Sequence, residues 1–204
     1  MISFLFKTAN NITGGWSYIV CIQSDNGMQH NKGDYVVYGE NGVCKIIDIR
    51  DESFAGLDVT AYYVLETVYS HTTIFIPLNS EALSGKLKKI LSVEKINALI
   101  DDTAIITEEW IEDCKERAKH FEELLNGGER CELLWLIKVL STHKTEVEEK
   151  NKRFYISDKN ILTAAEKVIT EEFAFVLGID KSDVVHYIRK RIAKNKLKDK
   201  TVDL

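Results

Sequence analysis

The chain has a single proline, Pro77, and lacks the short motifs that mark common enzyme classes. It contains no phosphate-binding glycine loop followed by lysine, no glycine-rich dinucleotide fingerprint and no nucleophile elbow. Its paired acidic residues fit helix caps and solvated helix faces. We therefore expect no enzymatic activity, no catalytic residue and no small-molecule substrate.

Cysteine is also scarce and scattered. The four cysteines are Cys21, Cys44, Cys114 and Cys131; they form no CxxC pair, and the five histidines are equally dispersed. Ligands of a structural metal usually come in closely spaced pairs. We therefore expect reduced, mostly buried thiols, no metal site and no cofactor.

Long apolar runs are missing as well. No run reaches the about 20 residues that a membrane-spanning helix needs. The apolar pieces of residues 1–27 are interrupted by asparagine and glycine and lack the basic start of a secretory signal. We expect a cytoplasmic protein without membrane contact. Because the strand pattern begins just after Met28, Met28 is a candidate natural start, with 1–27 as an atypical extension.

Short strands dominate the region 28–79. Four segments are predicted as strands: 35–38, 43–49, 61–68 and 72–76. They are rich in aromatic and β-branched residues, and Gly39-Glu40-Asn41-Gly42 predicts a hairpin turn between the first two. Pro77 ends the last strand because proline cannot donate to a ladder. Strands this short pack best as a strongly bent barrel of the SH3 or Tudor kind.

Helical periodicity begins after Ser80. The predicted helices start after Ser92, after Thr107, at Cys131, after Ser157 and after Ser182, and glycines at 127–128 and 178 end two of them. We expect connecting short helices over 80–106, a helical domain over 107–198 and a tail over 199–204. The predicted fold class is α+β, with a small N-terminal SH3/Tudor-like β-barrel followed by a compact all-α C-terminal domain.

Several pieces of the chain, in their order and spacing, resemble the CarD/CdnL family of bacterial transcription factors. They are Gly33-Asp34-Tyr35-Val36-Val37-Tyr38, Gly42-Val43, Tyr62-Tyr63-Val64-Leu65, Ile74-Phe75-Ile76-Pro77, Ser157 to Lys167 and Glu171 to Gly178. The resemblance runs from Lys32 to about Ile188. The barrel part is also similar to the polymerase-interaction module of transcription-repair coupling factors, but the absence of helicase sequence after it favours a stand-alone factor.

The resemblance implies a bivalent transcription regulator. The barrel is expected to pair a strand edge with the β subunit of RNA polymerase, and the helical domain to touch promoter DNA at the upstream edge of the bubble. Tethering through one domain raises the effective concentration for the other contact. The formal charge of −5 keeps an alternative open, an acidic protein–protein adaptor that uses the same edge without binding DNA.

The polymerase-binding residues implied by the resemblance lie on the strand that ends in Pro77. They are Thr73, Ile74, Phe75 and Ile76, with Glu52 nearby. Some relatives carry arginine where Phe75 and Glu52 stand, so salt bridges of that kind are not expected here. An apolar or backbone-mediated contact is the remaining expectation, and the alternative is that Phe75 is an ordinary barrel core residue.

The DNA-binding residues implied by the resemblance begin with Trp110, as a wedge in the minor groove at the bubble edge. Trp110 falls about one helical turn earlier than the family's tryptophan, and Asp113 stands at that tryptophan's place. The alternative for Trp110 is therefore interdomain packing. The candidate phosphate contacts are Lys115, Arg117, Lys119, Lys152, Arg153, Lys159 and Lys167. The lysines of 194–200 are expected to form a solvated helix end.

Overall fold

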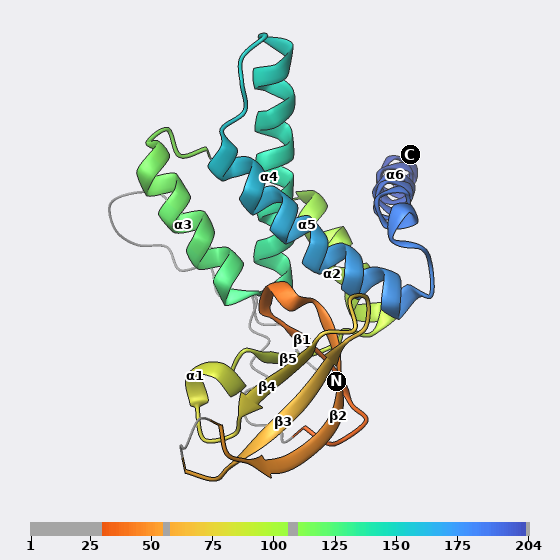
Figure 1. Ribbon diagram of the computed structural model, residues 1–204. Helices are drawn as coiled ribbons and strands as arrows, with labels where there is room; N and C mark the ends of the chain where they lie inside the picture. The colour runs from red at the N-terminus through yellow and green to blue at the C-terminus, as the bar shows by residue number, and fades with distance from the viewer. Residues whose placement is uncertain (1–29, 55–57, 106–109, 203–204) are drawn as a thin grey trace, which may run out of the picture.

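The computed structural model describes residues 30–54, 58–105 and 110–202. It contains a five-stranded antiparallel sheet followed by a layer of helices, with the sheet below the helices in Figure 1. The predicted α+β fold class, a β part followed by a helical part, is therefore confirmed. The predictions about residues 1–27 and about a cap at Thr107 lie outside the described residues.

The sheet has the strand order β4-β3-β2-β1-β5. The strands are β1 (Tyr35–Tyr38), β2 (Val43–Glu52), β3 (Thr60–Thr67), β4 (Thr73–Pro77) and β5 (Leu87–Lys89). The register of β2 and β3 shifts between Ile46 and Asp48, as at a β-bulge. All five strands contribute side chains to one small core, which includes Val36, Leu65 and Leu87. The sheet thus curls around its own core, and its two edges in the described residues are β4 and β5.

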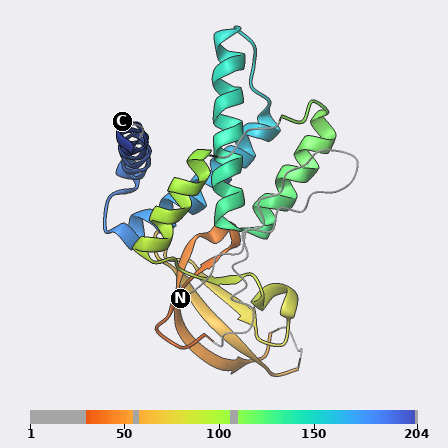
Figure 2. The ribbon, with the colours of Figure 1, turned by 180° about the vertical axis from the view of Figure 1, so that it is seen from behind.

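The connection after β4 differs from the prediction. Residues 80–106 were expected to hold connecting short helices, and the chain adds to them a strand, β5, which lies along β1 after α1 (Glu81–Ser84). The following helix α2 (Val93–Ile105) starts as predicted, because the Ser92 hydroxyl accepts from the Lys95 amide at 3.3 Å. Figure 2 shows α2 on the rear of the helical layer, between α4 and α6.

The remaining helices are α3 (Cys114–Gly127), α4 (Arg130–Glu149), α5 (Ile156–Leu177) and α6 (Val184–Val202), with the short 3₁₀ helices η1 (Gly39–Asn41) and η2 (Lys181–Asp183). Their C-terminal glycines are as predicted, since Gly128 and Gly178 both adopt the left-handed conformation. Two predicted caps are wrong, because Tyr155 rather than Ser157 precedes α5, and α6 begins after η2 rather than at a Ser182 cap. In the described residues, α3 begins at Cys114 with Asp113 as its cap.

A buried ion pair and its hydrogen bonds fasten the sheet to the helices. Arg130 donates to both carboxylate oxygens of Glu172 at 3.0 and 3.2 Å and to the Lys89 carbonyl at 2.9 Å. The amide of Leu91 donates to the same Glu172 carboxylate at 3.0 Å. Because Lys89 and Leu91 flank the exit from β5, this network ties the sheet to α4 and α5.

The hairpin turn between β1 and β2 also meets the helices, as Figure 1 shows below the lower ends of α3 and α4. Val37 and Val43 join the helical core rather than the sheet core. Gly42 has φ +71° and ψ −146°, a region almost restricted to glycine. A Cβ at Gly42 would lie 2.1 Å from the Glu171 carboxylate, whose residue is only 6% exposed.

Replacing Gly42 with alanine is expected to lower the free energy of unfolding by about 1 to 3 kcal/mol from backbone strain, with displacement of Glu171 in addition. Gly39→Ala is a matched control, because Gly39 also has positive φ but leaves its Cβ position open. Urea denaturation measures both. Equal losses in the two variants would contradict the close approach of Gly42 to α5.

The thiols follow the prediction only in part. Cys44 and Cys114 are free, and burial, with the Glu171 charge as a second cause, raises the pKa of Cys44 to about 11. Cys131 is disulfide-bonded, so the prediction of reduced thiols is wrong there, since spacing alone does not reveal connectivity. No helix within the described residues is both long and apolar enough to cross a membrane.

Candidate interaction surfaces

The free edge of β4 presents backbone donors in a defined pattern. The Thr67 amide donates to the Thr72 carbonyl at 3.0 Å, and the Leu78 amide donates to the Ala61 carbonyl at 2.8 Å. Hydrogen bonds in an antiparallel pair involve alternate residues, so the amides of Thr73 and Phe75 point away from β3. Pro77 has the same orientation and lacks an N–H. Among the described residues no strand pairs with β4 on this side, so the edge offers two donors, at Thr73 and Phe75.

The side chains of β4 divide between the two faces of the sheet. Ile74 packs against the sheet core and Ile76 belongs to it, with 2% exposure. The Ile76 side chain is therefore buried in the sheet core and Ile74 is partly buried against it, so the predicted contact of these two residues with the polymerase stays a prediction for their backbone. Thr73 is exposed and Phe75 half-buried, as period-2 alternation requires.

Phe75 belongs to an aromatic cluster on the outer face of the sheet, made by Phe54, Tyr62 and Phe75. The Phe54 ring lies 5.3 Å from Tyr62 and 5.1 Å from Phe75 between centroids, both edge to face. Phe54 is 40% exposed. The alternative that Phe75 is a core residue is therefore wrong. The cluster offers an apolar surface next to the open edge of β4.

Charged residues border the aromatic cluster on β2. The Arg50 guanidinium lies 5.9 Å from the Phe75 ring centroid and donates to Glu52 at 2.7 Å. Asp48 pairs with Lys32 at 3.0 Å, and this hydrogen bond lowers the pKa of Asp48. Glu52 thus lies beside the candidate surface with its carboxylate engaged by Arg50, and its contact with the polymerase stays a prediction.

Trp110 lies before α3 and packs inside the helical layer. Its ring stacks on His143 with 3.5 Å between centroids and meets Phe121 edge to face. The guanidinium of Arg117 lies 4.4 Å from the Trp110 centroid. These contacts hold the ring between α3 and α4, so packing among helices, rather than interdomain packing, accounts for its position. The helix predicted after Thr107 would include Trp110, but Trp110 precedes α3, whose cap is Asp113.

The contact between Trp110 and His143 predicts a pH dependence of stability. Burial, with repulsion from Arg117 as a second cause, lowers the pKa of His143 below its ordinary value of 6.5. The unfolded chain then binds the proton more readily, so stability is full above pH 6.5 and falls as the pH drops below it. We expect His143→Phe to flatten the urea-midpoint profile between pH 7 and 5. An unchanged profile would contradict a neutral, stacked His143.

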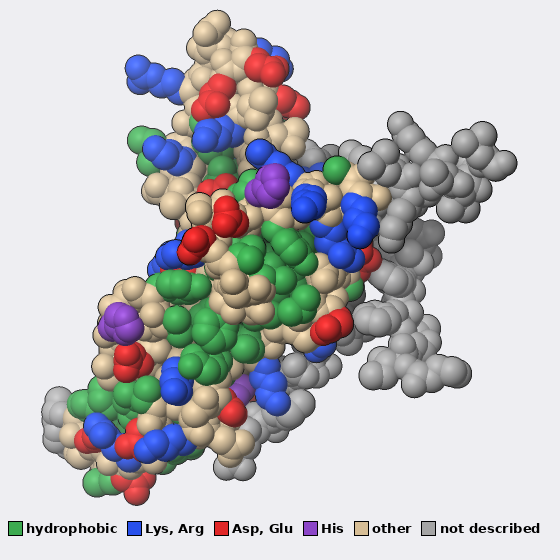
Figure 3. All heavy atoms as spheres, turned by 90° about the vertical axis from the view of Figure 1, so that its right-hand side faces the viewer, with side chains coloured by type: hydrophobic (Ala, Val, Ile, Leu, Met, Phe, Trp, Pro, Cys, Tyr) green, Lys and Arg blue, Asp and Glu red, His purple; other side chains and the backbone are tan. Residues whose placement is uncertain are grey.

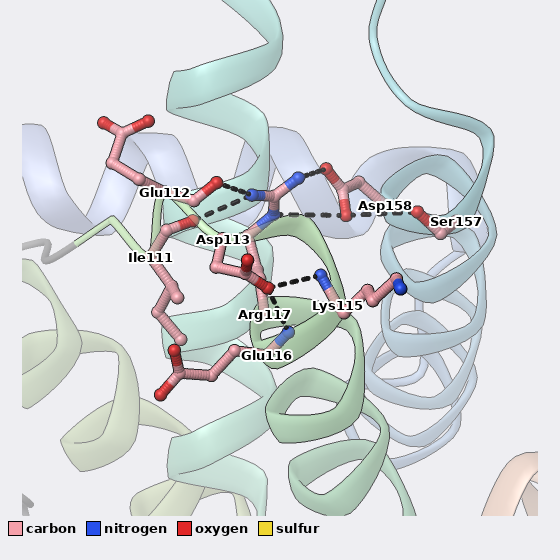
Figure 4. Close-up of polar contacts among 8 residues, drawn as sticks. All are labelled: Ile111, Glu112, Asp113, Lys115, Glu116, Arg117, Ser157 and Asp158. Atoms are coloured by element: carbon pink, nitrogen blue, oxygen red, sulfur yellow. Dashed lines mark hydrogen bonds and ion pairs between the residues drawn. The ribbon is translucent and has the colours of Figure 1, made fainter.

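Arg117 is buried, with 1% exposure. Its guanidinium donates to both oxygens of Asp158, at 3.4 and 3.0 Å, and to the carbonyls of Ile111 and Glu112 at 2.8 and 3.3 Å (Figure 4). The prediction that Arg117 contacts DNA is wrong, because its donors are directed inward. The pair instead fastens the start of α3 to the first turn of α5.

The other predicted cationic residues are exposed, but they lie on different elements. Lys115 and Lys119 are on α3, Lys152 and Arg153 precede α5, and Lys159 and Lys167 are on α5. Lys119 is 4.0 Å from Glu123, and Lys167 donates to the Glu40 carbonyl at 3.0 Å. Lys152, Arg153 and Lys159 lie close together in the chain, at the start of α5.

Sequence reasoning missed four apolar residues on these surfaces: Phe54, Tyr62, Tyr155 and Ile156. The outward position of Tyr62 follows from alternation along β3, since Tyr63 faces the sheet core. Tyr155 and Ile156 stand just before the predicted Ser157 cap, and no sequence signal indicates their exposure of 57% and 77%. Within the described part of the chain, no group of His, Cys, Asp and Glu residues could hold a metal ion.

Comparison with known families gives one finding that bears on the sheet. Residues 30–91 match the family model described as the CarD-like/TRCF RID domain. These residues span β1 to β5, including the open edge and the aromatic cluster, and the match confirms the resemblance to CarD-like proteins stated above for this part of the chain. No curated protein matches the chain.

Proposed function

Because residues 30–91 form a CarD-like/TRCF RID domain, an RNA-polymerase-interacting domain, we propose that the chain is a transcription regulator that modulates the lifetime of the open promoter complex. It binds the β subunit of RNA polymerase through the edge of β4 and promoter DNA through its helical layer. It acts without a cofactor and without catalysing a reaction.

The observation that carries the proposal is the open edge of β4 within the matched region. A strand of the β subunit can add to this edge and accept hydrogen bonds from the amides of Thr73 and Phe75. The aromatic cluster beside the edge replaces the arginines of some relatives. Its exposed ring, Phe54, gives the added strand an apolar surface to cover.

Affinity for purified RNA polymerase and for its isolated β subunit tests the polymerase contact. The full chain is expected to bind both saturably, and Phe54→Ser is expected to weaken binding by about tenfold through lost apolar burial. Leu83→Ser, on α1, removes a similarly exposed apolar side chain outside the cluster and serves as control. Absence of binding by the folded chain would overturn the proposal.

The DNA contact is tested by charge reversal. Lys152→Glu, Arg153→Glu and Lys159→Glu together are expected to remove the effect on open-complex lifetime while polymerase binding persists, because phosphate contacts depend on positive charge. An undiminished promoter effect in this variant would contradict the DNA contact. Polymerase binding with no promoter effect of the unmodified chain would favour an adaptor.

A further inference from the structure

A short, partly buried linker connects the sheet to the helical layer. It consists of Ile90, Leu91 and Ser92, between the end of β5 and the start of α2. Leu91 is 5% exposed within the helical core, and Ile90 packs against the same core. Flexible linkers are rich in glycine and serine, whereas this one has a single serine and buries its central residue. The linker therefore gives the two layers little freedom to turn on each other.

An apolar seam joins the two layers, and Figure 3 shows apolar side chains gathered in the middle of the molecule, between the helices above and the sheet below. Val37 and Val43 of the sheet lie in the helical core. The Tyr35 ring on β1 lies 4.7 Å from the Phe175 ring on α5 between centroids. Domains of one chain are expected to move relative to each other unless their interface is large and hydrophobic, so the seam favours a fixed arrangement.

Polar contacts attach α5 to two turns of the sheet. Lys167 donates to the Glu40 carbonyl, in the turn between β1 and β2, at 3.0 Å. About one helical turn further along, the Glu171 carbonyl accepts from the Tyr69 hydroxyl, in the turn between β3 and β4, at 3.2 Å. The Lys181 ammonium lies 4.2 Å from the Tyr69 ring centroid and 3.5 Å from the Glu171 carboxylate. These contacts hold both turns against one stretch of α5.

The buried pair of Arg130 and Glu172 attaches α4 and α5 to the sheet at β5. The Glu172 side chain is fully buried and that of Arg130 is 7% exposed. Both also bond to the backbone at the linker, since Arg130 donates to the Lys89 carbonyl and Glu172 accepts from the Leu91 amide. Turning the sheet on the helices would separate these groups, and a buried charge that loses its partner is strongly destabilising.

We infer that α5 holds the sheet and the helical layer as one rigid body, with Arg130 and Glu172 as positioning residues. The open edge of β4 then keeps a fixed distance and orientation relative to the start of α5. The consequence for transcription rests on the proposed function: polymerase bound at the β4 edge determines where the helical layer meets promoter DNA. A hinge between the layers would let the helical layer adopt many orientations, and the DNA contact would gain less from the polymerase contact.

The distance between the two layers tests the inference in the full chain. Spin labels attached to p-acetylphenylalanine in place of Asp51 on β2 and Lys144 on α4, both exposed, report this distance by double electron–electron resonance. We expect one narrow distance distribution in the otherwise unmodified chain, the same with and without RNA polymerase. A broad distribution, or two populations, would overturn the inference before any further variant is made.

Replacing the buried pair tests its positioning role. Arg130→Met with Glu172→Leu removes both charges and keeps apolar volume, so the chain should fold, but the backbone groups at the linker lose their partners. We expect a broadened distance distribution. The matched control, Arg117→Met with Asp158→Leu, removes the buried pair between α3 and α5, and its distribution should stay narrow. Equal broadening in both variants, or in neither, would overturn the assignment to Arg130 and Glu172.

Open-complex lifetime gives a readout that a merely structural role would not move. The double variant of Arg130 and Glu172 should bind polymerase with unchanged affinity, because β4 is intact, yet its effect on this lifetime should fall by about tenfold or more. An undiminished effect despite broadened distances would overturn the consequence for transcription. Failure of the unmodified chain to bind polymerase would overturn the proposed function, whereas the distance distributions decide the rigid body independently of it.

Discussion

Replacing Asp158 with alanine is expected to lower the free energy of unfolding by about 3 to 5 kcal/mol. Asp158 is fully buried, and the side chain of its partner Arg117 is 2% exposed. Removing the carboxylate leaves the guanidinium charged, desolvated and without its counterion. Urea denaturation of the full chain measures the loss.

A double variant separates the charge from the packing. Arg117→Met combined with Asp158→Leu removes both charges and restores apolar volume, so it should be less destabilising than Asp158→Ala alone. The double variant also leaves the carbonyls of Ile111 and Glu112 without their donor, so some loss remains. A cost of Asp158→Ala below about 1 kcal/mol, typical of surface pairs, would contradict a structural role for Arg117.

Replacing Thr73 with proline is expected to weaken polymerase binding by about tenfold or more. Proline removes the amide that points to the open edge of β4 and leaves the partner's carbonyl unpaired. The ladder between β4 and β3 is kept, because Thr73 lies at a position whose amide faces away from β3. Affinity for the isolated β subunit measures the effect.

Thr73→Ala is the matched control for this change. It removes the exposed side chain but keeps the amide, so binding should remain within about twofold of the unmodified chain. If alanine and proline at this position weaken binding equally, the side chain and not the backbone makes the contact. That result would contradict strand addition at the β4 edge.

Much of the sheet could be predicted from local pattern. Runs of aromatic and β-branched residues, together with the glycine turn between them, predicted β1 to β4, because these signals act within a few residues. The strand β5 was missed because Leu87-Lys88-Lys89 is short and charged, and it is a strand only through its pairing with β1. The same limit applies to α3, where Thr107 and Asp113 are both good capping residues and local pattern does not choose between them.

Contacts between distant parts of the chain determine where the side chains of Arg117 and Trp110 lie. Arg117 was predicted to face DNA because it lies among lysines, but its partner Asp158 is 41 positions away. Trp110 packs on His143, and no spacing rule connects the two. The outward position of Phe75, in contrast, follows from alternation along β4 and could be predicted from the sequence.

Amide hydrogen exchange of the full chain, resolved to single residues, tests the polymerase contact most directly. On adding RNA polymerase, the account predicts new protection at Thr73 and Phe75, whose amides face the open edge of β4. Ile74 and Ile76 should change little, because β3 already protects their amides. Binding of polymerase without added protection at Thr73 and Phe75 would contradict the account.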